Sequence, residues 1–166
     1  NNPESRFTFN HITSCDVTNK NEFYNGDAVI SYLSQEIYNK NLELNAKINT
    51  YFNKVYVIGD IQGCYDKLKA FMDEHYSHDN FYIFTGDYTD RGDKNKETLQ
   101  YLCKLAKANN TQFLLGNHEG YVCQYMSGGK SNHKQFNDVT LKEIETITNT
   151  QKEINNLFDT ICINLF

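Results

Sequence analysis

The chain has 166 residues and a net charge of −5 at neutral pH, a size that suits one domain with a hydrophobic core. Its Lys and Arg residues are scattered, which leaves no basic stripe for a nucleic-acid backbone, and no run approaches the about 20 apolar residues of a membrane span. Five cysteines without a CxxC pair argue against a disulfide framework or a zinc ribbon, so we expect a cytoplasmic protein that binds neither nucleic acid nor membrane.

Residues 1–53 are predicted to form an N-terminal arm or helical extension. A short strand is expected around residues 6–12. Asp27 is a candidate N-cap, because the apolar residues that follow it recur with helical spacing. Leu44, Ile48 and Phe52 indicate further helical turns. No motif in this segment points to a chemistry.

From Lys54 onward, short apolar runs each end in Gly plus a polar residue and are followed by a helical period. The three expected strands cover residues 55–58, 81–84 and 113–115, with helices at 65–72 and 99–106 between them. Strand, helix, strand, helix, strand is typical of a mostly parallel βαβαβ sheet with flanking helices, which makes the fold class α/β. In such sheets ligands bind beyond the carboxyl ends of the strands.

The rest of the chain is predicted to be helical with one loop. A short helix is expected over 121–126, followed by a loop over 127–133. Apolar residues from Ile154 to Leu165 recur on one helical face and predict an amphipathic helix. The histidines away from the strand ends are expected at the surface: His75, His78 and His133.

Three motifs follow the three strands in order. They are Gly-Asp-Ile-Gln-Gly at 59–63, Gly-Asp-Tyr-Thr-Asp-Arg-Gly at 86–92 and Gly-Asn-His-Glu at 116–119. In these motifs the chain resembles the calcineurin-like metallophosphoesterases, in particular their phosphoprotein-phosphatase branch, whose pattern is GDxHG, GDxxDRG and GNHE. The resemblance covers about residues 54–166 and implies the N-terminal half of such a domain, which is an α/β-sandwich.

Oxygen-bearing side chains at the strand ends are the candidate metal ligands. Asp60 follows a rigid strand and is flanked by glycines that permit a tight turn, so it is well placed to hold a cation. The resemblance assigns Asp87 the bridge between two divalent metal ions, and Asn117 offers a neutral oxygen. Gln62 stands where most of the family has His. Because an amide oxygen is a harder ligand than imidazole, we expect Mn²⁺ or Mg²⁺ in preference to zinc, with Mn²⁺ first and Mg²⁺, iron or zinc as the alternatives.

The remaining motif residues are the candidate catalytic groups. His118 suits protonation of a leaving oxygen, with Asp90 as the carboxylate that orients it. Arg91 offers a planar fork for a phosphate group, although a structural pairing with Asp90 or Asp93 is the alternative.

The resemblance implies a metal-dependent enzyme that hydrolyses phosphate monoesters with a metal-activated hydroxide, on a phosphorylated protein (Ser/Thr or Tyr phosphate) or a small phosphorylated substrate. The run from Gly59 to Asp66 is also similar to bacterial symmetrical dinucleoside-tetraphosphatases, which makes dinucleoside polyphosphates the alternative substrate. A third possibility is a degenerate, non-catalytic binding module. The family's two later histidine ligands have no counterpart here, so we expect a fragment whose open face is covered by the missing C-terminal half or by a partner chain.

Overall fold

The computed structural model describes residues 26–147, 149–158 and 161–162, and the strand expected at 6–12 lies outside this part. Within it, four parallel strands form one sheet in the order β1-β2-β3-β4. The strands are β1 Lys54–Ile58, β2 Asn80–Phe84, β3 Thr111–Leu114 and β4 Ile161–Cys162. The α/β class and the three predicted strands are therefore confirmed, and each strand starts one or two residues before its expected start.

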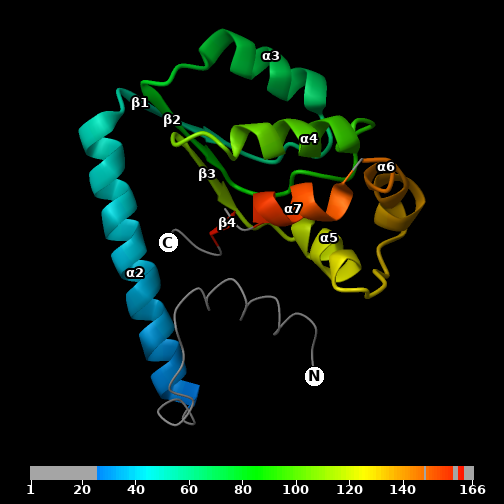
Figure 1. Cartoon of the computed structure of the whole chain (residues 1–166), viewed down its shortest axis with the longest axis horizontal. Coiled ribbons are helices and arrows are strands. Elements are labelled where there is room, and N and C mark those ends of the chain that lie inside the picture. The colour runs from blue at the N-terminus through cyan, green and yellow to red at the C-terminus, as the bar shows by residue number, and fades with distance from the viewer. Residues whose placement is uncertain (1–25, 148, 159–160, 163–166) are drawn as a thin grey trace.

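Helices connect each strand to the next. α3 (Tyr65–His75) joins β1 to β2, and α4 (Asn95–Leu105) joins β2 to β3. The connection from β3 to β4 contains α5 Glu119–Met126, the π-helix η1 Phe136–Thr140, α6 Leu141–Ile144 and α7 Thr150–Phe158. Because consecutive strands are neighbours and such crossovers are right-handed, the connecting helices lie on one face of the sheet. Figure 1 shows α3, α4 and α7 side by side there, and α4 contacts both of the others.

The hydrophobic core lies between this helical layer and the sheet. Tyr82, Phe84 and Phe113 point from the strands into it and are fully buried. The rings of Phe84 and Phe113 stack on neighbouring strands with centroids 4.7 Å apart. Leu68 and Leu102 meet them from α3 and α4. This packing fixes the strand ends relative to one another.

The opposite face of the sheet is partly open. The end of the N-terminal helix α2 (Gly26–Tyr51) reaches it, where Phe52 packs on Phe81 with ring centroids 5.0 Å apart. Farther along β1, Val55 and Val57 are 45% and 66% exposed. The helix predicted in this arm is confirmed, but it is one continuous helix, and Asp27 lies inside its first turn rather than before it.

The C-terminal prediction was partly wrong. Ile161 and Cys162 belong to β4, not to the amphipathic helix, because they pair in parallel with Phe113 and Leu114. The free edge of β3 offers unpaired backbone groups, and satisfying them outweighs the helical pattern. The helical structure expected after the loop is present, but it is divided into η1, α6 and α7.

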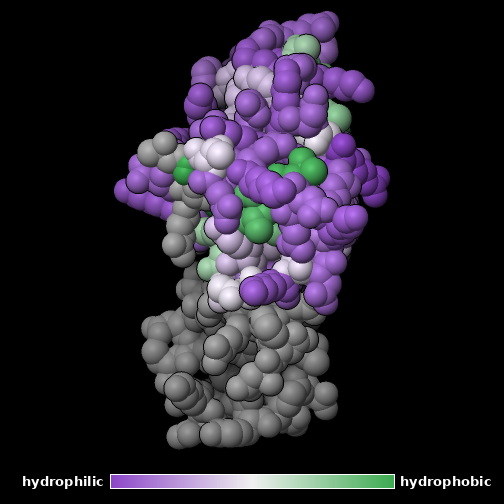
Figure 2. Space-filling model, turned by 90° about the vertical axis from the view of Figure 1, so that its right-hand side faces the viewer, coloured by the Kyte–Doolittle hydropathy of each residue, from purple (hydrophilic) through white to green (hydrophobic). Residues whose placement is uncertain are grey.

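The outer surface near η1 and α6 is mostly hydrophilic, with small separate apolar areas (Figure 2). Val139 in η1 is one of the exposed apolar residues. Among the described residues, no helix combines the length and the apolar composition that crossing a membrane requires.

Candidate active site

Backbone hydrogen bonds join the first two motifs directly. The carbonyl oxygen of Asp87 accepts the N–H groups of Ile61 and Gln62 at 3.1 and 2.9 Å. Gln62 and Asp87 both adopt positive φ, at 50° and 53°. Such conformations are uncommon for residues other than glycine and cluster at functional sites. The end of β1 and the end of β2 therefore form one connected turn structure.

Glu119 ties the second motif to the third. Its carboxylate accepts the N–H groups of Asp87 (2.8 Å), Tyr88 (2.8 Å) and Gly116 (2.9 Å). The side chain is fully buried, and this burial raises the pKa of Glu119 to about 7 against the opposing effect of the three backbone donors. Gly116 has no room for a side chain, because a Cβ there would lie 2.2 Å from Oδ1 of Asp87.

The predicted metal ligands come together in two contacting pairs at this edge of the sheet. Oδ2 of Asp60 accepts the Gln62 amide at 3.0 Å. The Asn117 amide nitrogen, turned toward Asp87, lies 3.1 and 3.2 Å from its two carboxylate oxygens. The backbone bonds from Ile61 and Gln62 to Asp87 join the two pairs. The backbone segments that carry the two pairs are therefore adjacent.

The donor set has the chemistry of a site for a hard cation. It offers two carboxylates and two amides, and oxygen donors of this kind suit a hard divalent ion better than zinc. The amide nitrogens face Asp60 and Asp87 in this structure, so both amides would have to turn their oxygens toward a cation. In the part of the chain that the structure describes, no three His, Cys, Asp or Glu side chains are grouped closely enough to hold a metal ion. A cation here would depend on the amide oxygens of Gln62 and Asn117 as well as on Asp60 and Asp87.

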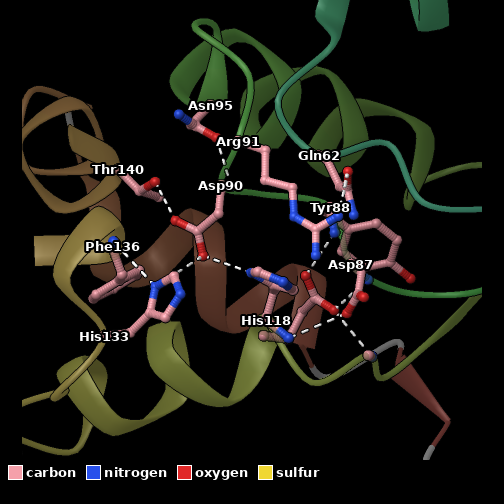
Figure 3. Close-up of polar contacts among 12 residues, drawn as sticks. Gln62, Asp87, Tyr88, Asp90, Arg91, Asn95, His118, His133, Phe136 and Thr140 are labelled. Carbon is pink, nitrogen blue, oxygen red and sulfur yellow. Dashed lines mark hydrogen bonds and ion pairs between the residues drawn. The ribbon is translucent and has the colours of Figure 1, made fainter.

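His118 and Asp90 form a buried pair beside these ligands. Nδ1 of His118 lies 2.7 Å from Oδ2 of Asp90, and the backbone N–H of His118 donates to Oδ1 of Asp87 at 3.1 Å. Because an ionised carboxylate only accepts, Nδ1 is the donor and Nε2 is the nitrogen left for a substrate. Figure 3 shows this pair beside Asp87, with Arg91 extending over Gln62. Arg91 is exposed and donates to Oε1 of Gln62 at 3.4 Å.

The prediction of a plain surface histidine fails at His133. This residue is half-buried, its ring stacks on Tyr121 with centroids 4.5 Å apart, and its Nδ1 lies 3.9 Å from Asp90. The loop after α5 folds back onto the pair, which no local pattern around His133 indicates. His78 is exposed as expected, whereas His75 is half-buried against Tyr56 and Phe71.

A family model described as calcineurin-like phosphoesterase matches residues 53–163, which include all three strand-end motifs. The chain belongs to this family. Its members normally use divalent metal ions. The match includes each of the seven predicted site residues: Asp60, Gln62, Asp87, Asp90, Arg91, Asn117 and His118.

Several curated family relatives are named bis(5'-nucleosyl)-tetraphosphatases. The asymmetrical enzyme PrpE of Halalkalibacterium halodurans is 28% identical over 106 residues, which is 58% of this chain and 43% of that protein. The symmetrical enzyme of Neisseria gonorrhoeae is 41% identical over 70 residues, 40% of this chain and 24% of that protein. The symmetrical enzyme of Pasteurella multocida is 39% identical over 78 residues, which is 45% of this chain and 27% of that protein. The chain thus matches less than half the length of each relative.

Proposed function

We propose that this site hydrolyses dinucleoside polyphosphates in a metal-dependent reaction. The observation that carries the proposal is the buried Asp90–His118 pair one residue away from Asn117, whose amide contacts Asp87. In this proposal His118 is a proton donor next to the oxygens that would hold the cations. The names of the relatives support a dinucleoside substrate.

Each side chain has a defined task in this proposal. Asp60, Gln62, Asp87 and Asn117 would hold the cations, which when bound would lower the pKa of a water molecule and offset phosphate charge. His118 donates a proton to the oxygen that leaves phosphorus as water adds to it, so that one P–O bond forms and one breaks. Asp90 keeps the imidazole in place and stabilises its charged form.

Arg91 would hold the substrate rather than stabilise the fold. Its side chain is exposed, and it reaches Gln62 at the edge of the predicted ligand set. A guanidinium in this position offers parallel N–H donors to a phosphate group of the chain between the two nucleosides.

Two other functions stay open as alternatives. The sequence alone favoured a phosphate monoester on a phosphorylated protein, and the Asp90-Arg91-Gly92 run and Glu119 still support that branch. A non-catalytic binding module is the second, supported by the exposed Val55 and Val57 on the open face of β1, which a C-terminal half or a partner chain would cover.

A product analysis separates these functions. The chain is incubated with Mn²⁺ and, in parallel, with diadenosine tetraphosphate, a phosphopeptide and p-nitrophenyl phosphate. We expect turnover of the dinucleotide, to two ADP if cleavage is symmetrical and to ATP plus AMP if it is asymmetrical. Preferential release of phosphate from the phosphopeptide would favour the phosphatase. No turnover together with no Mn²⁺ uptake by calorimetry would contradict both enzymes.

A further inference from the structure

The Asp90 carboxylate has a second buried partner from a segment outside the three motifs. Its Oδ1 accepts a hydrogen bond from the hydroxyl of Thr140, while Oδ2 faces His118. Asp90 and Thr140 are both completely buried, and they lie 50 positions apart in the sequence. Figure 3 shows Asp90 between the two side chains.

The local structure around Thr140 aims it at this carboxylate. Thr140 is the last residue of η1, and π-helical turns are rare and often occur at functional sites. The core residues Phe136 and Ile144 anchor the segment on either side. The hydroxyl of Thr98 donates to the carbonyl of Lys94 in its own helix at 2.8 Å. The hydroxyl of Thr140 donates to Asp90 instead.

A second link holds the same segment to the loop that carries Asp90. Glu143 accepts the N–H groups of Asn95 (2.8 Å) and Lys96 (3.2 Å) and thereby caps the start of α4. Asn95 in turn accepts the N–H of Asp90 at 2.8 Å. Asp90 and Arg91 adopt positive φ, at 72° and 62°, so their loop is strained and needs such support.

We propose that Thr140 is a positioning residue, which fixes the rotation of the Asp90 carboxylate so that Oδ2 stays directed at His118. With Thr140 on Oδ1, the carboxylate has one orientation that satisfies both donors. Without that hydroxyl, Oδ1 loses its donor and the carboxylate is free to rotate about its Cβ–Cγ bond, because the Nδ1 of His133 accepts the N–H of Phe136 at 3.2 Å and has no proton to offer. Thr140 therefore acts through Asp90 and does not touch the substrate.

The test uses matched threonine variants of the full chain. Thr140→Val removes the hydroxyl at nearly constant volume, Thr140→Ser keeps it, and Thr98→Val removes a buried hydroxyl away from the site. This inference rests on the proposed function for its kinetic arm, so the NMR resonance of the His118 Nδ1 proton is recorded as well. That signal reports the bond to Asp90 whether or not a substrate is turned over.

For Thr140→Val we expect kcat with diadenosine tetraphosphate to fall about tenfold with little change in KM. We also expect its His118 proton resonance to shift and broaden, whereas Thr140→Ser and Thr98→Val keep the wild-type signal and kcat. The inference is overturned if Thr140→Val keeps that resonance, or if Thr98→Val changes it equally. If the wild-type chain turns over no substrate, the proposed function fails and the resonance alone decides. Should Thr140→Val not fold, Thr140→Cys is measured in the same way.

Discussion

Oε2 of Glu119 accepts the backbone N–H of Asp87 at 2.8 Å, across 32 positions of the sequence. Its carboxylate also holds the N–H groups of Tyr88 and Gly116. One buried side chain thus joins the ends of β2 and β3, from which Asp87 and Asn117 extend. The arrangement of the candidate ligands depends on this residue, although it has no ligand role of its own.

Replacing Glu119 with Gln should lower the free energy of unfolding by about 1–3 kcal/mol at pH 7, because the amide has one acceptor oxygen and leaves a buried N–H without a partner. Urea denaturation measures the change. Glu74→Gln, on the exposed side of α3, serves as the control and should stay within about 0.5 kcal/mol of wild type. Equal losses in the two variants would contradict the role given to Glu119.

The stability of the wild-type chain should also depend on the protonation of Glu119. Burial raises its pKa to about 7, whereas an unfolded Glu titrates near about 4.3. Between these values the folded state binds more protons than the unfolded state, so this contribution to stability falls as pH rises from about 4.3 to about 7. Glu119→Gln lacks this titrating group. With a metal chelator present, the difference in the free energy of unfolding between wild type and Glu119→Gln should therefore become smaller as the pH rises over that range. A difference in the free energy of unfolding between the two proteins that stays constant from pH 5 to pH 8 would contradict the raised pKa of Glu119.

Two glycines four positions apart should respond in opposite ways to alanine. Gly116→Ala places a Cβ 2.2 Å from Oδ1 of Asp87 and should destabilise the chain by about 1–3 kcal/mol and weaken Mn²⁺ binding. Gly120→Ala, in α5 with nothing within 4 Å, should be neutral or stabilise by up to about 1 kcal/mol. Thermal unfolding and calorimetry with Mn²⁺ check both. If Gly116→Ala binds Mn²⁺ with unchanged affinity, Asp87 is not a ligand of the ion.

The acid pair should control the chemical step rather than substrate binding. His118→Asn removes the proton donor and should lower kcat about 10²- to 10⁴-fold with a small effect on KM. Asp90→Asn should cause a smaller loss of kcat, because the imidazole remains. Steady-state kinetics with diadenosine tetraphosphate measure both, and His78→Asn, at an exposed position, is the control. A rise in KM without a fall in kcat would argue that His118 only binds substrate.

The three motifs allowed the sheet to be predicted and the seven candidate site residues to be assigned to its strand ends, because strand ends of a parallel sheet share one edge. Apolar runs at residues 55–58, 81–84 and 113–115 are bounded by Gly-containing turns, so both the strand type and the direction of the following side chain could be predicted. The direct contacts of Asp60 with Gln62 and of Asn117 with Asp87 were not predictable in detail, since they depend on turns with positive φ.

What the sequence did not reveal depends on long-range packing. His133 and Thr140 approach Asp90 only because residues 127–144 fold back over α4 and α5. The local sequence pattern around these two residues does not indicate that contact. Ile161 and Cys162 continue a helical spacing, yet pairing with the edge of β3 determines their conformation. Tertiary context overrides local pattern at these positions.

In the proposed active site, the three strand ends together form one cation site with the acid pair beside it. Paramagnetic broadening of backbone amide signals by Mn²⁺, recorded by NMR on the full chain, tests this most directly. We expect broadening centred on residues 60–63, 86–92 and 116–119, and its loss in Asp87→Asn. Broadening that is absent, or confined to the exposed carboxylates of α3, would contradict the claim.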